Sequence, residues 1–138
     1  VFGVLSIVIN ATGKESMDDL NGFYSTNPRL SIIMLVSLFS LAGIPPVAGF
    51  FGKFFLFTAA ASNGMYILVF IAVINATISL YYYLLVVKAM FINKNESPLA
   101  PLSSTLYEKI AISLCLVGVL AIGFVSDIYN YIQSLLAI

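Results

Sequence analysis

The chain has 138 residues, of which 61% are hydrophobic and 9% charged, and its six Lys and Arg balance its six Asp and Glu. Soluble domains carry about 25% charged residues, so these charges are too few for a water-exposed surface, and a zero net charge excludes a nucleic-acid-binding module. With no His and one Cys, a His-based catalytic site, a Cys/His metal site and an internal disulfide are excluded. The composition predicts an all-α, polytopic membrane protein.

Apolar segments alternate with charged loops along the chain. Residues 1–9 are apolar, but at about 1.5 Å per residue they cover less than half of a bilayer. We expect them to belong to the end of a helix at about 1–12, and the chain to be the C-terminal part of a longer protein. Three longer runs approach or exceed the ~20 residues that a membrane helix needs. We predict three complete transmembrane helices in one membrane domain, at about 30–60, 65–91 and 106–127.

The charged residues outside these runs predict the orientation. Two loops carry all Lys and Arg residues except Lys53, and they lie two membrane crossings apart, so they share one side. The residues concerned are Lys14, Arg29, Lys88, Lys94 and Lys109. The turn at 62–64 and the C-terminal tail contain neither Lys nor Arg. By the positive-inside rule, we expect the charged loops to face the cytoplasm, or the matrix of an organelle.

Local signals also mark where helices begin. Asn27 followed by Pro28 offers an N-cap and a first-turn proline. Thr105 and Glu108 have the spacing of a capping box. Residues 16–20 are expected to start a short helix on the membrane surface.

The run from 30 to 61 contains a helix-breaking motif. As one straight helix its 32 residues would be about 48 Å long, well beyond a hydrocarbon core of about 30 Å. Its middle reads Gly43-Ile44-Pro45-Pro46. Two consecutive prolines remove two backbone donors and leave the carbonyls of Leu41 and Ala42 without their usual partners. We predict two half-helices, about 30–43 and 47–60, joined by an unwound link.

A break at this depth has a functional and a structural interpretation. Freed backbone groups cannot face lipid, so the link must be buried in protein or line a hydrated cavity. Discontinuous helices near the midplane recur in ion transporters. The alternative is a proline kink with a structural role only.

Lys53 is the one charged residue in the apolar run from 30 to 61. It lies seven residues after Pro46 and eight before Ala61, about 12 Å from the helix end. An ionisable group at this depth is a functional hypothesis by default. A lysine whose proton affinity responds to water and neighbouring charge can load and release a proton, as a proton pathway requires. The alternative is a lysine that snorkels to the surface with help from local thinning of the bilayer.

The next predicted helix carries polar residues that share one face. Asn75 and Ser79 are four residues apart and lie on the same side as Tyr82 or Tyr83. One interpretation is that these four residues hold waters leading toward Lys53. The other is that Asn75 and Ser79 only form hydrogen bonds between helices.

At residues 38–54 and 78–84 the sequence resembles the antiporter-like subunits of respiratory complex I. The discriminating pattern is Gly49-Phe50-Phe51-Gly52-Lys53-Phe54, which is most similar to subunit N of NADH:quinone oxidoreductase. The resemblance implies fourteen helices in two inverted repeats, of which this chain covers the end of the eleventh to the fourteenth. It also implies that Lys53 is the terminal-channel lysine and that the family's glutamate–lysine pair lies upstream.

The resemblance implies a proton-translocating subunit of NADH:quinone oxidoreductase. Quinone reduction elsewhere in the complex would be coupled to proton transport through Lys53, so the chain itself would hold no redox active site, no cofactor and no metal. NADH, FMN, iron–sulfur clusters and quinone are expected in partner subunits. The expected setting is a hetero-oligomer with other membrane subunits of complex I, in a bacterial plasma membrane or an organelle inner membrane. The alternatives are a subunit of an Mrp-type cation/proton antiporter and a structural membrane subunit without a transport role.

Overall fold

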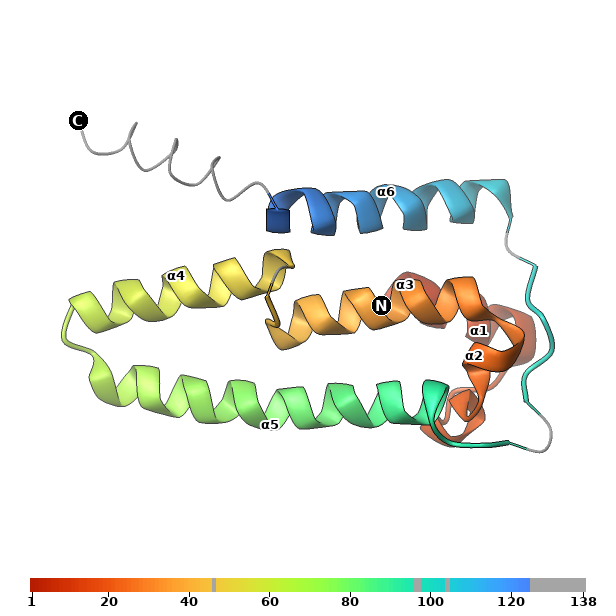
Figure 1. The fold of residues 1–138 in the computed structure, drawn as a ribbon, viewed down its shortest axis with the longest axis horizontal. Coiled ribbons are helices and arrows are strands. Elements are labelled where there is room, and N and C mark those ends of the chain that lie inside the picture. Colours follow the sequence, from red (N-terminus) through yellow and green to blue (C-terminus); the bar gives the residue numbers. More distant parts are fainter. Residues whose placement is uncertain (46, 96–97, 104, 125–138) are drawn as a thin grey trace.

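The computed structural model describes residues 1–45, 47–95, 98–103 and 105–124 (Figure 1). Within these ranges every regular element is a helix, so the predicted all-α class is confirmed. In chain order the elements are α1 (Phe2–Thr12), the 3₁₀ helix η1 (Met17–Leu20), α2 (Phe23–Thr26), α3 (Pro28–Ala42), α4 (Ala48–Ser62), α5 (Tyr66–Phe91) and α6 (Leu106–Phe124).

Helices α3 and α4 are the two halves of the predicted broken helix. α3 ends at Ala42 and α4 begins at Ala48, and Pro46, the second proline of the motif, lies outside the described residues. Each half has 15 residues, about 22 Å, so neither alone spans a hydrocarbon core of about 30 Å. The first turn of α4 lies beside the last turn of α3 (Figure 1).

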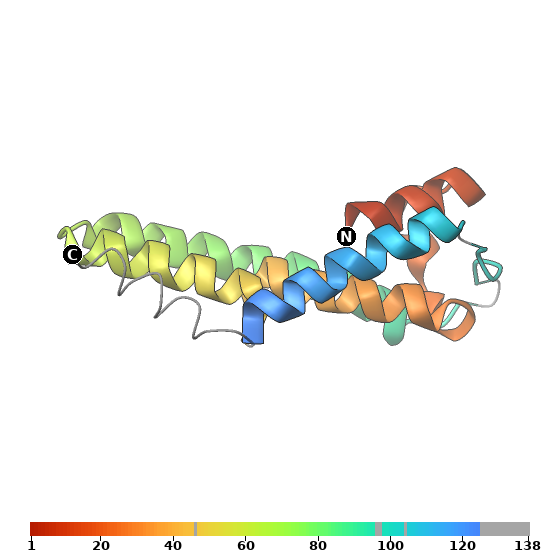
Figure 2. The ribbon, with the colours of Figure 1, turned by 90° about the horizontal axis from the view of Figure 1, so that it is seen from above.

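Helix α5 and the 106–123 part of α6 are long and apolar enough to cross a membrane. α5 packs along both α4 and α3, and α6 contacts both halves as well. Seen from above, α6 runs obliquely to α3 and α4 (Figure 2). The last three residues of the predicted final span, 125–127, lie outside the described residues. The broken helix is thus held between the two long helices.

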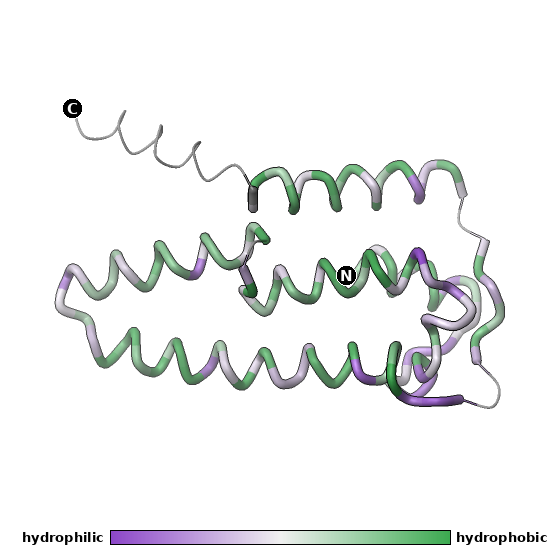
Figure 3. Tube along the Cα trace, in the orientation of Figure 1, coloured by the Kyte–Doolittle hydropathy of each residue, from purple (hydrophilic) through white to green (hydrophobic). Residues whose placement is uncertain are grey.

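The two charged loops meet at one end of the molecule, as their spacing predicts. The backbone N–H of Gly22 donates to the carbonyl of Ala89 at 3.1 Å, and Nδ2 of Asn93 donates to Oδ1 of Asn21 at 2.9 Å. Hydrophilic segments gather there, whereas most of the remaining helical length is apolar (Figure 3). The Ser62-to-Met65 turn lies at the opposite end (Figure 1).

The predicted start of α6 is confirmed. The N–H of Thr105 donates to Oε2 of Glu108 at 2.7 Å, and the N–H of Glu108 donates to Oγ1 of Thr105 at 3.4 Å. Reciprocal bonds of this kind satisfy donors that the first turn leaves open. A second capping box, which was not predicted, joins Ser16 and Asp19 at the start of η1.

The predicted side-chain role of Asn27 is wrong, although α3 does begin at Pro28. Asn27 makes no side-chain cap. Its Nδ2 instead donates to the carbonyl of Ala100 at 3.2 Å, and its Oδ1 accepts from the N–H of Leu102 at 2.7 Å. The side chain is turned to the loop before α6 because that loop's backbone offers it both a donor and an acceptor.

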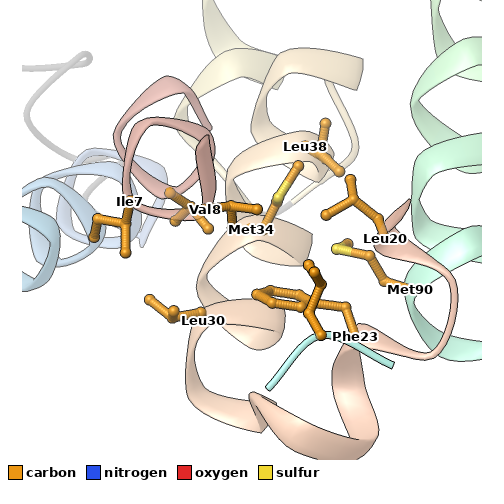
Figure 4. Close-up of a cluster of buried hydrophobic side chains, with 10 residues drawn as sticks. Ile7, Val8, Leu20, Phe23, Leu30, Met34, Leu38 and Met90 are labelled. Carbon is orange, nitrogen blue, oxygen red and sulfur yellow. The ribbon is translucent and has the colours of Figure 1, made fainter. Parts of the chain in front are cut away.

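The hydrophobic core lies near the charged end, where α1, η1, α2, α3 and the end of α5 meet (Figure 4). Its buried members are Val4, Ile7, Val8, Leu20, Phe23, Leu30, Met34, Leu38, Met90 and Leu99. Helix α4 has no buried residue, and many large apolar side chains of α5 are exposed. The α4–α5 hairpin therefore presents apolar surface that no described part of the chain covers.

Candidate functional site at the helix break

Helix α3 ends in a tight backbone turn centred on Gly43. Gly43 has φ 82° and ψ 37°, a left-handed conformation that strongly favours glycine. Its N–H donates to the carbonyl of Ser40 at 3.1 Å, and the N–H of Ile44 donates to the carbonyl of Phe39 at 3.0 Å. This Schellman arrangement satisfies two of the four terminal carbonyls of α3 and leaves two more without helical partners.

Lys53 supplies the partners for these remaining carbonyls. Its Nζ donates to the carbonyl of Leu41 at 2.7 Å and to that of Ala42 at 3.0 Å. In an unbroken helix their donors would be the N–H groups of residues 45 and 46, which are both prolines. The ammonium also lies at the C-terminal, partly negative end of α3, where a positive charge is stabilising. The proline doublet and Lys53 are therefore one structural unit.

In a second contact between the two half-helices, the side chain belongs to α3 and the backbone group to α4. The N–H of Gly49, in the first turn of α4, donates to Oγ of Ser40 at 3.2 Å. The backbones lie so close that a Cβ on Gly49 would overlap the carbonyl oxygen of Ser40. We refer to Ser40, Leu41, Ala42, Gly49 and Lys53 as the break site. Within it, α4 caps the end of α3, and α3 caps the start of α4.

The side chain of Lys53 runs back along α4 toward the break, not toward the surface at Ser62. This direction follows from the tilt of helical side chains toward the N-terminus. Lys53 is half-buried, and its Cδ lies 3.0 Å from the position that a Cβ on Gly43 would take. Phenylalanine rings line the same helix, with Phe50 stacked on Phe54 at 5.8 Å between ring centroids. The ammonium therefore has polar partners in otherwise apolar surroundings.

The polar residues of α5 are not joined to the break site. Oγ of Ser79 donates to the carbonyl of Asn75 in its own helix at 2.9 Å. Tyr82 is 61% exposed, and Tyr83 packs against the hydrophobic core. No hydrogen bond in the described part of the chain connects any of these four residues to Lys53. Their role as a water path stays a prediction.

Asn75 and Lys53 are equally far, counted along their helices, from the turn that joins α4 to α5. Lys53 lies nine residues before Ser62, and Asn75 lies nine residues after Tyr66, which is about 14 Å along each helix. Because α4 and α5 pack against each other, the backbone positions of the two residues lie at equivalent levels of the hairpin, although the side chain of Lys53 extends from there toward the break.

The sequence did not predict a cavity that lies next to the break site. Its volume is about 350 Å³, and it lies between α1, α3 and α6, with Ser37, Ser40, Leu41 and Cys115 among its lining residues. This volume has room for several waters. Ser37 and Ser40 are three residues apart in one helix, and that spacing is the signal in the sequence that could have identified them.

Comparison with known proteins identifies the family. The family model described as "NADH:quinone oxidoreductase/Mrp antiporter, TM" matches residues 1–79, more than half of the chain. The chain belongs to this family. The match contains the whole break site together with Asn75 and Ser79, whereas Tyr82 and Tyr83 lie beyond it.

Individual members of the NADH:quinone oxidoreductase/Mrp antiporter family are similar over most of the chain. NADH-quinone oxidoreductase subunit N of Phocaeicola vulgatus is 50% identical over 97% of this chain and 29% of its own length. Subunit N of Azobacteroides pseudotrichonymphae is 48% identical over 97% of this chain and 28% of its own length. The chloroplastic NAD(P)H-quinone oxidoreductase subunit 2 of Zygnema circumcarinatum is 39% identical over 90% and 27%, respectively. The chain therefore spans less than a third of the length of these relatives.

A solved structure supports the same membership. A chain of respiratory complex I from Thermus thermophilus with bound aureothin superposes with a TM-score of 0.69 and 33% sequence identity. The superposition covers 80% of this chain and 26% of that one.

Proposed function

We propose that this chain is part of a proton-translocating subunit N of an NADH:quinone oxidoreductase, and that Lys53 is its proton carrier at the helix break. The observation that carries the proposal is the pair of bonds from the Lys53 ammonium to the freed carbonyls of Leu41 and Ala42. The family model and the subunit N relatives support the assignment to this kind of subunit.

The geometry supports an exchange of protons between Lys53 and water. A lysine ammonium has three N–H donors, and the two carbonyls use two of them, which leaves one for a water molecule. The cavity at Ser37 and Ser40 offers water one approach to the break. When Lys53 loses its proton, its favourable interaction with the end of α3 weakens. The protonation state of Lys53 is thereby linked to how firmly the two half-helices are joined.

We extend the proposal to the rest of the assembly. NADH, FMN, iron–sulfur clusters and quinone would be held by partner subunits, and redox chemistry there would drive the change of protonation at Lys53. The relatives include bacterial and chloroplastic subunits. We place the chain in a bacterial plasma membrane or an organelle inner membrane, in contact with other membrane subunits of complex I.

An Mrp-type cation/proton antiporter is the second candidate, because the family description covers both assemblies. The same break site would serve either one, and only the partner subunits would differ. The subunit N relatives favour complex I.

Two substitutions of Lys53 in the assembled complex test the proposal. Lys53→Arg keeps the charge and the donors that hold α3, but arginine does not release its proton near neutral pH. We expect Lys53→Arg to assemble normally while coupled turnover falls by about 10-fold or more, because a positioned proton-transfer group contributes roughly 100-fold. Lys53→Met removes both properties, so we expect assembly to weaken as well. NADH-dependent quinone reduction and proton uptake are recorded together in closed vesicles.

Lys94→Met is the matched control, because Lys94 is exposed in the loop after α5. It should pump at the wild-type level. If Lys53→Arg also pumps at that level, Lys53 only caps a helix, and the proton-carrier role is wrong.

A further inference from the structure

A cavity opens between the beginnings of α3 and α6, at the end of the molecule where the charged loops gather. Its volume is about 460 Å³. Its lining includes the cations Arg29 and Lys109, the polar residues Ser103 and Ser113, and the apolar residues Ile33 and Ile112. The cavity adjoins the one beside Ser37 and Ser40, with which it shares Ile33 and Ile112, but it contains no residue of the break site.

Both cations at this opening lack an acidic partner within the described ranges of the chain. The one ion pair in those ranges joins Lys14 to Asp19 at 3.8 Å, away from this cavity. Glu108 is next to Lys109 in sequence, but it accepts from the N–H of Thr105 in the capping box and does not line the cavity. Two exposed positive charges therefore flank one opening.

The loop wall of the cavity is held in place. Asn27, which also lines the cavity, is only 7% exposed. Its side chain bonds to the backbone of Ala100 and Leu102. The loop that carries Ser103 is therefore fastened to the start of α3, and the cavity does not depend on a freely moving segment.

Polarity changes along the cavity in the same way on both helices. Ile33 follows Arg29 by four residues in α3, and Ile112 follows Lys109 by three residues in α6. At these spacings each isoleucine lies on the same face as its cation, one turn closer to the middle of the helix. The cavity thus has a cationic rim at the loop end and apolar walls toward the membrane interior.

We propose that this cavity binds the head-group phosphate of an anionic phospholipid, with an acyl chain between Ile33 and Ile112. Basic pockets between membrane helices favour anionic head groups, and the apolar walls match the chain that a lipid carries below its phosphate. A soluble anion would use the cations only. The lipid would join α3 to α6 at the end of the molecule opposite the α4–α5 turn.

The test uses the complete subunit in its purified complex, titrated in detergent with phosphatidylglycerol and, separately, with phosphatidylcholine. Native mass spectrometry counts the lipids retained. The double variant Arg29→Gln/Lys109→Gln should bind phosphatidylglycerol about 30-fold more weakly, at roughly 5-fold for each cation near the surface. Phosphatidylcholine binding should not change.

Two further variants keep the result interpretable. Lys88→Gln/Lys94→Gln removes two exposed charges at the same end of the molecule but outside the cavity. This variant should bind phosphatidylglycerol like the wild type. Ser113→Trp fills the cavity without changing charge and should weaken binding of that lipid.

Three results would overturn the proposal. In the first, the wild-type complex has no preference for phosphatidylglycerol. In the second, Lys88→Gln/Lys94→Gln loses as much binding as the cavity variant. In the third, a crosslinker on Ser113→Cys captures an acidic segment of a neighbouring subunit, which would make the cavity a protein interface.

Discussion

At the scale of single residues, the break site shows how one charge can replace two missing backbone donors. The prolines at 45 and 46 leave two carbonyls at the end of α3 unpaired, and an unpaired carbonyl at membrane depth is costly. Lys53 bonds to both. An ammonium suits this position better than a neutral side chain because the C-terminal end of a helix is partly negative.

Gly43→Ala should disturb the break site without removing a polar group. An alanine with φ near 82° costs roughly 1–2 kcal/mol, and its Cβ would lie 3.0 Å from Cδ of Lys53. We expect a lower melting temperature of the complete subunit and reduced proton uptake. Gly52→Ala is the control, because its Cβ would meet nothing within 4 Å. Equal effects of the two substitutions would show that the backbone of Gly43 is not under this constraint.

At the scale of elements, the half-helices overlap at the break. The last turn of α3 and the first turn of α4 lie side by side (Figure 1). Because of this overlap, the side chain of Ser40 in α3 bonds to the backbone of α4, and the side chain of Lys53 in α4 bonds to the backbone of α3. An ordinary proline kink bends a helix that otherwise continues, so its two halves do not overlap and cannot cap each other in this way.

Gly49→Ala should force the two half-helices apart. Its Cβ would overlap the carbonyl oxygen of Ser40, and neither backbone is free to move as a flexible side chain would. Overpacking of this kind costs about 1–3 kcal/mol. We expect thermal unfolding of the complete subunit at a lower temperature, together with a loss of coupled pumping. Gly118→Ala in α6 has open space around its Cβ and should leave both measurements unchanged; a similar loss there would contradict the explanation.

At the scale of the whole molecule, the two ends of the helical assembly differ in the contacts that stabilise them. At the charged end, buried apolar side chains and hydrogen bonds between loops connect α1, α2, α3 and α5 (Figure 4). At the other end, the α4–α5 hairpin leaves large apolar side chains exposed. Such a surface requires an apolar covering, either lipid or further protein.

Asn27→Ala should loosen the charged end. Asn27 joins the start of α3 to a loop 73 residues further along the chain, and its loss leaves the carbonyl of Ala100 and the N–H of Leu102 without this partner. Each lost hydrogen bond of this kind costs about 0.5–1.5 kcal/mol. We expect faster proteolysis of the 98–103 loop and a lower melting temperature.

The control for Asn27→Ala is Asn10→Ala. Asn10 is exposed, and its side chain makes one long bond of 3.4 Å to Ser6, so its loss should have little effect. Unchanged protease sensitivity in Asn27→Ala would mean that the loop is held by other contacts.

Much of this architecture is determined by the sequence alone, because the forces involved act over a few residues. The apolar runs require helices, the proline doublet requires a break, and it identifies the carbonyls of Leu41 and Ala42 as the unpaired groups. The capping box at Thr105 requires only a partner three residues away. These requirements arise from the local backbone and are the same whatever tertiary contacts the chain makes.

The tertiary structure alone decided which partners meet those demands. Lys53 lies 11 and 12 residues from the carbonyls to which it donates, and only the overlap of the two half-helices brings its ammonium to them. Asn27 has the sequence of an N-cap, yet a loop 73 residues away competes successfully for its side chain. Spacing along a chain specifies what a group needs, whereas the path of the chain through space specifies what lies within hydrogen-bonding distance.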